Sequence, residues 1–307
     1  MKSSIMNFIK TVAILLFLLG IVYIIENIDD YKDIFIKSSS SSKSSSIKND
    51  SLLNIYFIDV GEGDCILIKE NDTNILIDAG NNRDGQKLVT YLKELGIEEF
   101  EYVFSTHPHE DHIGGMDNII REFGINHFII PNMELETPTY QEVVKLIEEK
   151  QIDKIIPKID DEYAINNIKL KVLWVGDNLE EINWSSLVLK MDYFKTSYLF
   201  MADATKESEQ LILDKDLKCD VLKVAHHGSN WSSSAQFLEK ARPDYAIISV
   251  GKNNDYSFPK QVTLDKLKKI NATIYRTDLD GTIRITSNGE KIEVDTFFTD
   301  TNQEEKK

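Results

Sequence analysis

Residues 106–112 read THPHEDH and follow an apolar run with the pattern of a β-strand. Because side chains alternate along a strand, His107 and His109 are expected to face the same way. A turn into the next segment then brings Asp111 and His112 to a neighbouring point. Imidazole and carboxylate groups are ligands of zinc, and they also suit manganese or iron. The chain has six histidines and three of them stand here, so the spacing indicates two adjacent metal ions rather than a polar surface loop.

Two other apolar runs end in side chains of the same kinds. Residues 198–203 read YLFMAD. The carboxylate of Asp203 can bridge two cations, although an aspartate at this point can also cap a following helix. Residues 222–229 read LKVAHHGS and place His226 and His227 at the end of a predicted strand. We therefore expect all three segments to converge on one site.

Length and composition exclude several classes of protein. A chain of 307 residues with 42% hydrophobic and 28% charged side chains has material for one large domain or two ordinary ones. Two cysteines exclude a disulfide scaffold and a four-cysteine zinc ribbon. The formal net charge is −16, and residues 1–50 carry six lysines against five acidic groups. The remainder is therefore strongly anionic, which argues against a broad basic face for nucleic acid. It leaves room for an enzyme that grips one phosphate through metal ions.

Away from these segments, apolar runs of strand length alternate with amphipathic stretches of helix length. Three short strands come first, so a β-meander precedes the alternation, and the fold class is α/β (α+β). The predicted helices span 86–95, 116–123, 140–149, 206–213, 234–241 and 262–270. The predicted strands span 53–60, 65–69, 75–78, 102–105, 128–130, 169–175, 186–193, 198–201, 221–225, 245–250, 273–276, 282–286 and 291–296.

The amino-terminal fifty residues are expected to tether the domain. Residues 11–25 read TVAILLFLLGIVYII, without a charge, and extension back to Phe8 reaches the length of a membrane span. Residues 38–46 contain eight serines in nine positions, a composition that cannot bury apolar surface. We predict a cytoplasmic amino terminus at 1–10, a transmembrane signal-anchor at 11–25, a juxtamembrane and Ser-rich linker at 26–51, a globular domain at 52–298 and a polar tail at 299–307.

The fate and orientation of the apolar segment stay open. A cleaved secretory signal has an apolar core of similar length, although no A-x-A-like cleavage site follows this run. A buried core helix is the third alternative, against which the Ser tract argues. Two lysines precede the run and two follow it before the Ser tract, so the positive-inside rule does not fix the orientation. The short amino-terminal tail favours an inside amino terminus, which predicts a single-pass cell-membrane protein with its domain outside the cytoplasm. No obligate protein partner can be read from the sequence.

Seven ordered motifs together resemble the metallo-β-lactamase fold. The resemblance is closest to the ComEC-like branch, the hydrolase domain of competence DNA-uptake proteins, and it runs from about Asn54 to Ile285. The amino-terminal 50 residues and the multi-span channel of full-length ComEC proteins lie outside it. Besides H-x-H-x-D-H, the acid-ended strand and HHGS, the matching segments are DVGEGD at 59–64, LIDAG at 76–80, NWSSLV at 183–188, SVGKNN at 249–254 and YRTD at 275–278.

The resemblance implies a four-layer αββα sandwich with a metal site at one edge of the two sheets. In this fold His107 and His109 would hold the first metal ion, and Asp111 and His112 would hold the second. Asp203 would bridge the two ions. The implied cofactors are two divalent metal ions, zinc or alternatively manganese.

The same resemblance implies roles for three further residues. His227 would complete the second metal site, since the Gly-Ser that follows it matches the family's histidine position. His226 would lie behind the ligands or donate a proton, and the two histidines could be exchanged. Asp78 would be an acid that orients a ligand histidine.

Three departures from the family pattern affect this carry-over. Many relatives have another ligand histidine between the first cluster and the bridging aspartate. Here only His127 lies in that interval, badly placed in the next predicted strand, and Asn183 stands in the corresponding region, which weakens or hydrates the first site. Phe258 stands where the branch usually has the histidine of G-H-P, so a group that binds substrate or moves a proton is missing. Ala202 replaces a glycine before the bridging acid, which keeps the acid.

The two cysteines are expected to have structural roles, whereas two of the tryptophans are candidates for a role at the site. Cys65 and Cys219 stand at strand starts and are expected to be small core residues. Trp184 and Trp231 stand beside site motifs, so they are candidates for the rim of the site.

Together the residues and the resemblance predict a metal-dependent hydrolase. Two cations would lower the pKa of a bridging water and clamp the oxygens of an in-line displacement. Asp111 would accept the proton of that water, and His226 would protonate the leaving group. The resemblance favours a phosphodiester substrate, either DNA or a wall or lipid phosphodiester. The alternative is a surface-tethered binding module on a weakened hydrolase fold, which Phe258 motivates; β-lactam hydrolysis is a third option that the branch motifs disfavour.

Overall fold

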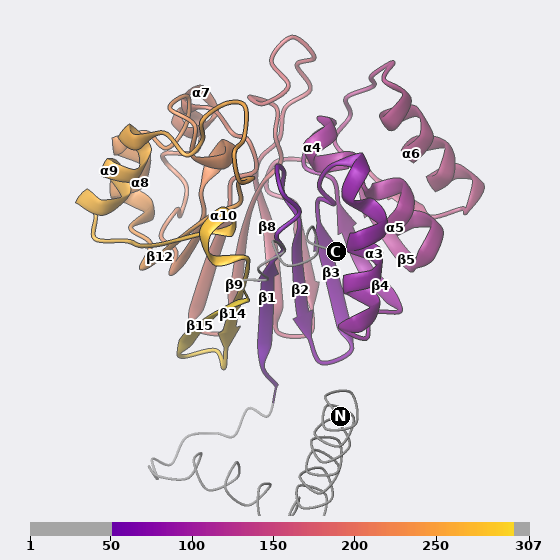
Figure 1. Ribbon diagram of the computed structural model, residues 1–307, viewed down its shortest axis with the longest axis horizontal. Helices are drawn as coiled ribbons and strands as arrows, with labels where there is room; N and C mark the ends of the chain where they lie inside the picture. Colours follow the sequence, from indigo (N-terminus) through magenta and orange to yellow (C-terminus); the bar gives the residue numbers. More distant parts are fainter. Residues whose placement is uncertain (1–50, 298–307) are drawn as a thin grey trace, which may run out of the picture. The chain divides into compact units, whose positions relative to one another are not determined.

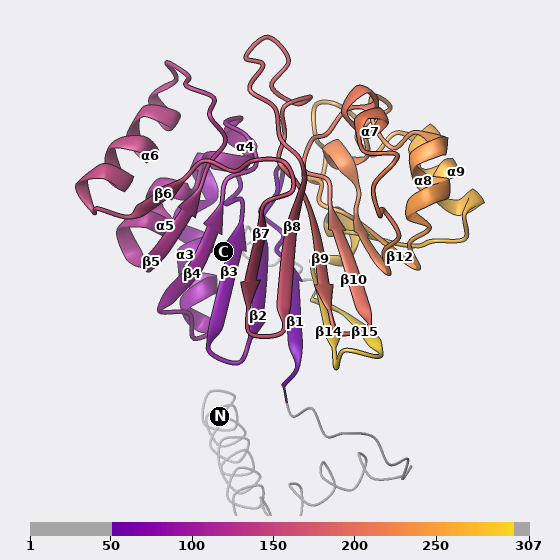
Figure 2. The same ribbon diagram turned by 180° about the vertical axis from the view of Figure 1, so that it is seen from behind.

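The computed structural model describes residues 51–297. They form two β-sheets that lie face to face, with helices on the outer faces (Figures 1 and 2). The predicted cytoplasmic terminus, membrane anchor and polar tail lie outside the described residues, as does all of the predicted linker except Ser51. Within residues 51–297, no helix is long and apolar enough to cross a membrane.

The first sheet is antiparallel on one side and parallel on the other. Its strands are β1 Leu53–Phe57, β2 Ile66–Glu70, β3 Thr73–Ile77, β4 Glu99–Phe104, β5 Gly124–Ile129, β6 Asp153–Ile155, β14 Thr282–Ser287 and β15 Ile292–Phe297. They lie in the order β15-β14-β1-β2-β3-β4-β5-β6. The predicted meander is present as β1, β2 and β3, and the parallel part runs from β3 to β6.

The second sheet repeats this division. Its strands are β7 Glu162–Ile165, β8 Ile168–Trp174, β9 Val188–Tyr193, β10 Thr196–Phe200, β11 Val221–Lys223, β12 Tyr245–Ile248 and β13 Thr273–Arg276. They lie in the order β13-β12-β11-β10-β9-β8-β7. The strands β7 to β10 pair antiparallel, whereas β10 to β13 pair parallel.

The helices of the described residues, except the last, connect parallel strands. They are η1 Asn82–Asp84, α3 Gly85–Glu94, α4 Glu110–Ile113, α5 Met116–Glu122, α6 Pro138–Glu149, α7 Lys206–Leu211, η2 Ala225–Gly228, α8 Ala235–Ala241, α9 Gln261–Lys269 and α10 Thr277–Asp280. Local sequence sets several of their starts. The Thr137 hydroxyl accepts a hydrogen bond from the backbone of Tyr140 at the start of α6, and Ser234 caps α8 in the same way.

Three apolar clusters show the order of the layers. Alternation along β1 sends Ile55 and Phe57 between the two sheets and Tyr56 to the outer face. The outer face of the first sheet packs against α3, α5 and α6, and that of the second sheet packs against α8 and α9. The order is therefore helix, sheet, sheet, helix.

The structure corrects the sequence prediction in several places. The strands β6 and β7 and the short helices α4 and α10 were not predicted. The predicted strand 128–130 starts earlier, at Gly124, because the polar residues of β5 lie at its exposed end. The predicted strand 221–225 ends at Lys223, so the histidine pair lies in the turn η2 beyond it.

Parallel pairing gathers the chemically active segments at one edge. The strands β3, β4, β10, β11 and β12 are followed directly by the segments that contain Asp78, residues 106–112, Asp203, the histidine pair and Ser249. Because parallel strands end at the same edge of a sheet, these segments meet although they lie far apart in the sequence.

Candidate metal centre

Asp78 holds the segment 106–112 in place at the end of β4. It follows β3, is fully buried and has a left-handed backbone with φ 58°. Its carboxylate accepts hydrogen bonds from the backbone N–H of Thr106 at 2.8 Å and from its hydroxyl at 2.6 Å. Oδ2 of Asp78 also lies 2.8 Å from Nδ1 of His112. This contact directs Nε2 of His112 into the site, so Asp78 stands where the resemblance predicted it.

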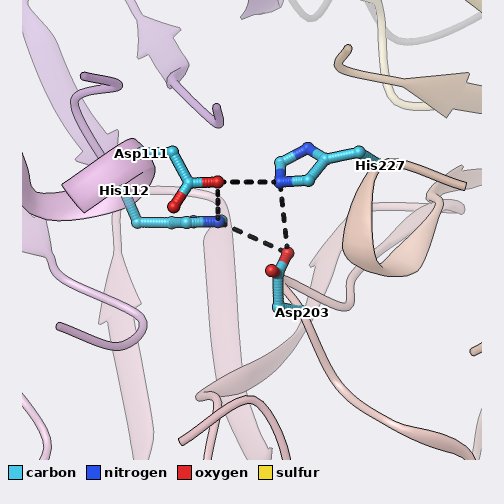
Figure 3. Close-up of side chains that lie close together, drawn as sticks. All are labelled: Asp111, His112, Asp203 and His227. Carbon is cyan, nitrogen blue, oxygen red and sulfur yellow. Dashed lines mark hydrogen bonds and ion pairs between the residues drawn. The ribbon is translucent and has the colours of Figure 1, made fainter. Parts of the chain in front are cut away.

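Four side chains form what we call the second centre (Figure 3). It comprises Asp111 and His112 from α4, Asp203 after β10, and His227 from η2. The distances between facing nitrogen and oxygen atoms are 3.2 Å for His227–Asp111, 3.3 Å for His112–Asp203, 3.6 Å for His227–Asp203 and 3.7 Å for His112–Asp111. A tetrahedral zinc ion with bonds of about 2.0–2.1 Å has ligand-to-ligand edges of roughly 3.3 Å. The donor atoms therefore already have nearly the spacing of a tetrahedral zinc shell.

Unpaired buried atoms in the second centre support the same interpretation. Nε2 of His112 and Oδ1 of Asp203 are buried, and neither has a hydrogen-bond partner among the described residues. A buried polar atom left unpaired costs about 1–3 kcal/mol, so folded proteins rarely keep one without a ligand. The residues present fit a divalent cation held by two carboxylates and two imidazoles.

A sparser group comprises His107, His109 and Asp203. It corresponds to the predicted site of the first metal ion, and we call it the first centre. Nε2 of His107 lies 3.1 Å from Nδ1 of His109 and 3.9 Å from Oδ2 of Asp203. Asp203 thus offers one oxygen to each centre. Asn183 lies beside this group, with Nδ2 3.3 Å from Nε2 of His226. With three donors, the first centre fits a cation that completes its coordination with water.

In the turn η2, the side chains of two consecutive histidines point in different directions. His226 and His227 both have φ 50°, a left-handed conformation that costs non-glycine residues about 1–3 kcal/mol and gathers at functional sites. Their rings are inclined by 77°. Nε2 of His227 faces the second centre, whereas Nε2 of His226 lies 3.7 Å from Oδ2 of Asp203. The backbone N–H of His226 donates to the Ala202 carbonyl at 2.8 Å, which ties the turn to the loop that carries Asp203.

A buried ion pair supports His227 from behind. Nζ of Lys223 lies 2.7 Å from Oδ2 of Asp64, and the two side chains are 0% and 2% exposed. Oδ1 of Asp64 lies 3.5 Å from Nδ1 of His227, which also lies 2.9 Å from the Ser249 carbonyl oxygen. A proton on Nδ1 donates to that carbonyl and leaves Nε2 to a cation. The backbone N–H of Asp64 donates to the carbonyl of Asp111 at 3.1 Å, so the pair contacts two candidate ligands.

Charges in the second centre reinforce one another. Burial opposes protonation of His112 and His227, but Asp203 and Asp111 outweigh it. They hold the pKa of His112 well above its usual range and raise the pKa of His227 to about 9. Burial likewise opposes ionisation of Asp111 and Asp203, yet the facing histidines lower the pKa of both carboxyls. The centre thus presents two ionised carboxylates, and a cation that binds there displaces protons from the histidines.

The pKa values of the other three histidines at the site shift in the opposite direction. Burial is the largest influence on His107, His109 and His226, and it holds the pKa of each below its usual value. Repulsion from His112 acts in the same direction on all three. These imidazoles are therefore neutral at neutral pH.

A cavity of about 380 Å³ opens onto both centres. Besides candidate ligands, its lining includes Glu62, Asn183, Tyr256 and Phe258. The two tryptophans considered for the rim are not part of this lining. Trp184 packs against Trp174, and Trp231 has 68% of its surface exposed. The lining includes two other aromatic residues instead, Tyr256 and Phe258.

The structure brings every predicted ligand position into this site. His107, His109, Asp111, His112, Asp203 and His227 all belong to one or both centres, and His226 adjoins them. His127 lies elsewhere, because its Nδ1 pairs with Asp153 at 2.7 Å and its ring stacks on Tyr102. Cys65 and Cys219 are buried free thiols, as predicted for core residues.

The sequence motifs did not identify Asp64 and Lys223 as functional residues. The available signal was the alternation along β11, where Val221 and Lys223 share the face between the sheets. A lysine on a buried face demands a buried partner, and Asp64 in the DVGEGD segment is that partner.

Comparison with known proteins identifies the class. Residues 58–252 match the family model of the metallo-β-lactamase superfamily, and the chain belongs to this superfamily. It is 31% identical over 251 residues to ComE operon protein 3 of Bacillus subtilis and 29% identical over 243 residues to Recombination protein 2 of Haemophilus influenzae. These are ComEC-like competence proteins, which confirms the predicted resemblance. The alignments cover 75% and 77% of this chain but 32% and 29% of those proteins, so the chain spans about a third of their length.

More distant similarities add the fold and one further relative. Ribonuclease Z of Nanoarchaeum equitans is 27% identical over 152 residues, 49% of this chain and 43% of that protein. The metallo-β-lactamase fold protein YhfI of Bacillus subtilis superposes with a TM-score of 0.52 at 12% identity, over 80% of this chain and all of that protein. CmlA, a diiron β-hydroxylase from Streptomyces venezuelae, gives 0.52 at 13% identity, over 79% and 55%. The family supports a metallo-hydrolase and implies divalent metal ions.

Proposed function

We propose that this chain hydrolyses a phosphodiester with the help of two divalent cations. One observation carries the proposal: the carboxylate of Asp203 offers Oδ1 to a four-donor centre and Oδ2 to a three-donor centre. Two cations bound in such a site activate water and stabilise the attacking and leaving oxygens of an in-line displacement. The fully buried Asp203 side chain fixes how far apart the two centres lie.

We assign to Asp111 the role of binding and orienting the attacking water. Its side chain is 29% exposed, lines the cavity and belongs to the second centre. The facing histidines lower its pKa, so the carboxylate stays ionised and accepts a hydrogen bond from water. A carboxylate of low pKa is a weak base, and its main contribution is therefore to orient the water.

We assign to His226 the role of donating a hydrogen bond to the leaving group. Its ring lies on the first-centre side of Asp203, and the residue lines the cavity. Burial keeps its pKa low, so a neutral imidazole donates a hydrogen bond to a phosphoryl or leaving oxygen. Full proton transfer requires the minor protonated form.

Support for a phosphodiester comes from the site and from one relative. The clamp of two centres suits the oxygens of a phosphoryl group, and the relative in Nanoarchaeum equitans carries the name Ribonuclease Z. The net charge of −16 disfavours tight wrapping of long DNA. The substrate classes that fit are DNA held at one short segment and a wall or lipid phosphodiester.

A surface-tethered binding module is the second candidate function. It is favoured by Phe258, which fills the position of a family histidine and whose ring lies 5.6 Å from the ring of His226. Metal analysis separates the two candidates. A hydrolase requires about two cations per chain, whereas a binding module on a weakened fold retains fewer than one.

The function is tested by turnover of bis-p-nitrophenyl phosphate. Asp203→Ala removes the carboxylate shared by both centres, and we expect a loss of more than ~100-fold, beyond the effect of residues that only support a ligand. Asp216→Ala is the matched control, because this carboxylate is 85% exposed and outside the site. Circular dichroism confirms folding of both variants. Equal turnover by folded Asp203→Ala and wild type would refute the proposal.

We also propose that the predicted anchor at 11–25 holds the domain at the outer side of the cell membrane. The uncharged apolar run and the serine tract that follows it support this placement. Protease treatment of intact cells should release the domain. Protection of the domain until the cells are lysed would place it inside.

A further inference from the structure

We propose that Tyr256 and Phe258 form a platform on which a planar ring of the substrate stacks beside the metal centres. The inference rests on the proposed phosphodiesterase function and extends it to the group next to the scissile phosphate. Both residues line the 380 Å³ cavity together with His226, Asp111 and Asp203. A ligand in this cavity therefore contacts the reacting groups and the aromatic rings at the same time.

The two rings already form a stack. The centroids of Tyr256 and Phe258 are 5.4 Å apart, and their planes differ by 18°. The edge of this stack adjoins the site, because the Phe258 ring lies 5.6 Å from that of His226 and inclined to it by 70°. Tyr256 is the outer ring and is 63% exposed. The stack thus leads from a catalytic histidine outward and presents an aromatic surface to the cavity.

The loop that carries the rings is fixed by one amide side chain. Asn254 donates from Nδ2 to the carbonyl of Gly251 at 3.0 Å and to that of Phe258 at 2.8 Å. Its Oδ1 accepts the backbone N–H of Phe258 at 2.8 Å. Pro259 then packs against Gly228, where an added Cβ would lie 2.4 Å from the proline ring. The platform is therefore held in position before a ligand binds, which reduces the entropy lost on binding.

A planar heteroaromatic ring of nucleobase size is the ligand that this surface suits. Stacking on an aromatic side chain is sequence-tolerant, because every base has a π-face. Lipid and wall phosphodiesters without a ring gain little from two nearly parallel aromatic planes. The ammonium group of Lys260 lies 5.3 Å from the centroid of the Phe258 ring and donates to the Tyr256 carbonyl, so the loop that carries the two rings also carries a positive charge. The geometry thus favours a nucleoside phosphodiester over a ring-free one.

The test compares two substrates that differ only in their bases. The first is a thymidine dinucleotide. The second is its abasic analogue, in which a tetrahydrofuran unit without a base replaces each nucleoside. Cleavage of both is followed by chromatography. Stacking by one base predicts that Tyr256→Ala raises KM for the dinucleotide roughly 5- to 150-fold, with kcat changed less than about twofold. KM for the abasic analogue should not change. Tyr256→Phe should retain the wild-type KM, since it keeps the ring.

Trp231→Ala is the matched control, because it removes an equally exposed aromatic side chain that does not line the cavity. An equal effect of Tyr256→Ala on both substrates, or the same effect from Trp231→Ala, would overturn the platform. If wild type turned over neither these substrates nor bis-p-nitrophenyl phosphate, the proposed function would fail by itself. The platform would then be judged by equilibrium binding of the uncleavable methylphosphonate dinucleotide, and unchanged binding by Tyr256→Ala would overturn it.

Discussion

The second centre and the first centre share Asp203 but differ in how their donors are held. In the second centre, His112 rests on Asp78 and His227 rests on the Ser249 carbonyl and on Asp64. In the first centre, the two histidines contact each other at 3.1 Å. Behind His107, the Thr106 hydroxyl lies 3.1 Å from Nδ1.

This difference shows that a shared carboxylate does not make two equal sites. Outer hydrogen bonds fix the tautomer and orientation of a ligand histidine and raise its affinity for metal. The second centre has such bonds behind both of its histidines, as well as a fourth donor. We therefore expect it to bind its cation first and more tightly, with the first centre filled at higher metal concentration.

The largest expected effect comes from removing one ligand of each centre. His112→Ala should weaken cation binding at the second centre by more than ~100-fold, because it opens the four-donor shell. His109→Ala should change the affinity of the second centre only a few-fold and should weaken cation binding at the first centre. A zinc titration against a chromophoric chelator measures both. Equal losses in the two variants would mean that the centres are not distinct.

Breaking the buried ion pair should have the next largest effect, on folding. Lys223→Met leaves the carboxylate of Asp64 buried without its partner, which should cost about 3–5 kcal/mol of unfolding free energy. The double variant Asp64→Asn/Lys223→Met should recover most of this loss. Lys87→Met is the control, because its surface pair with Asp84 has an 85% exposed lysine and contributes at most about 1 kcal/mol. Urea unfolding of the metal-free chain that showed no difference between the two lysines would contradict this account.

The residues behind the two ligand histidines should have smaller effects. Asp78→Asn should weaken the second centre about 10- to 100-fold, and Asp64→Asn should lie at the lower end of that range. The reason is distance: Asp78 contacts His112 at 2.8 Å, whereas Asp64 lies 3.5 Å from His227, which keeps the Ser249 carbonyl. The chelator competition assay decides the order, and a larger loss for Asp64→Asn would reverse our ranking of the two supports.

The dependence of the second centre on pH is expected to be the most gradual effect, at most about tenfold for each pH unit. The pKa of His227 is raised to about 9 in the metal-free chain, so below pH 9 a cation must displace a proton from this ring. The apparent affinity should therefore fall by up to about tenfold per pH unit for this proton as the pH drops from 9 to 7. Calorimetry in buffers of different ionisation enthalpy counts the protons released. Binding to the second centre without proton release would contradict the raised pKa.

The sequence alone predicted the parts of the fold that follow from periodicity. Apolar runs located most strands, and the helices α3, α5, α6, α8 and α9 appeared close to their predicted bounds. The strands β6 and β7 were missed because they are short and largely exposed, so they show little alternation of apolar and polar side chains.

The sequence also indicated which residues meet at the site, because histidines and acids at strand ends have few other reasons to cluster. It could not decide between His226 and His227, since their directions depend on two left-handed backbone conformations in η2. It also could not pair Asp64 with Lys223, because one lies in the loop before β2 of the first sheet and the other ends β11 of the second sheet. These features depend on tertiary geometry rather than on local pattern.

The most direct test of the account is an equilibrium zinc titration of the metal-free chain, repeated on Asp203→Ala. We predict two cations per wild-type chain with clearly different affinities, and loss of both high-affinity classes in the folded variant. A single cation whose binding survives Asp203→Ala, or fewer than one cation per wild-type chain, would contradict a shared carboxylate between two centres.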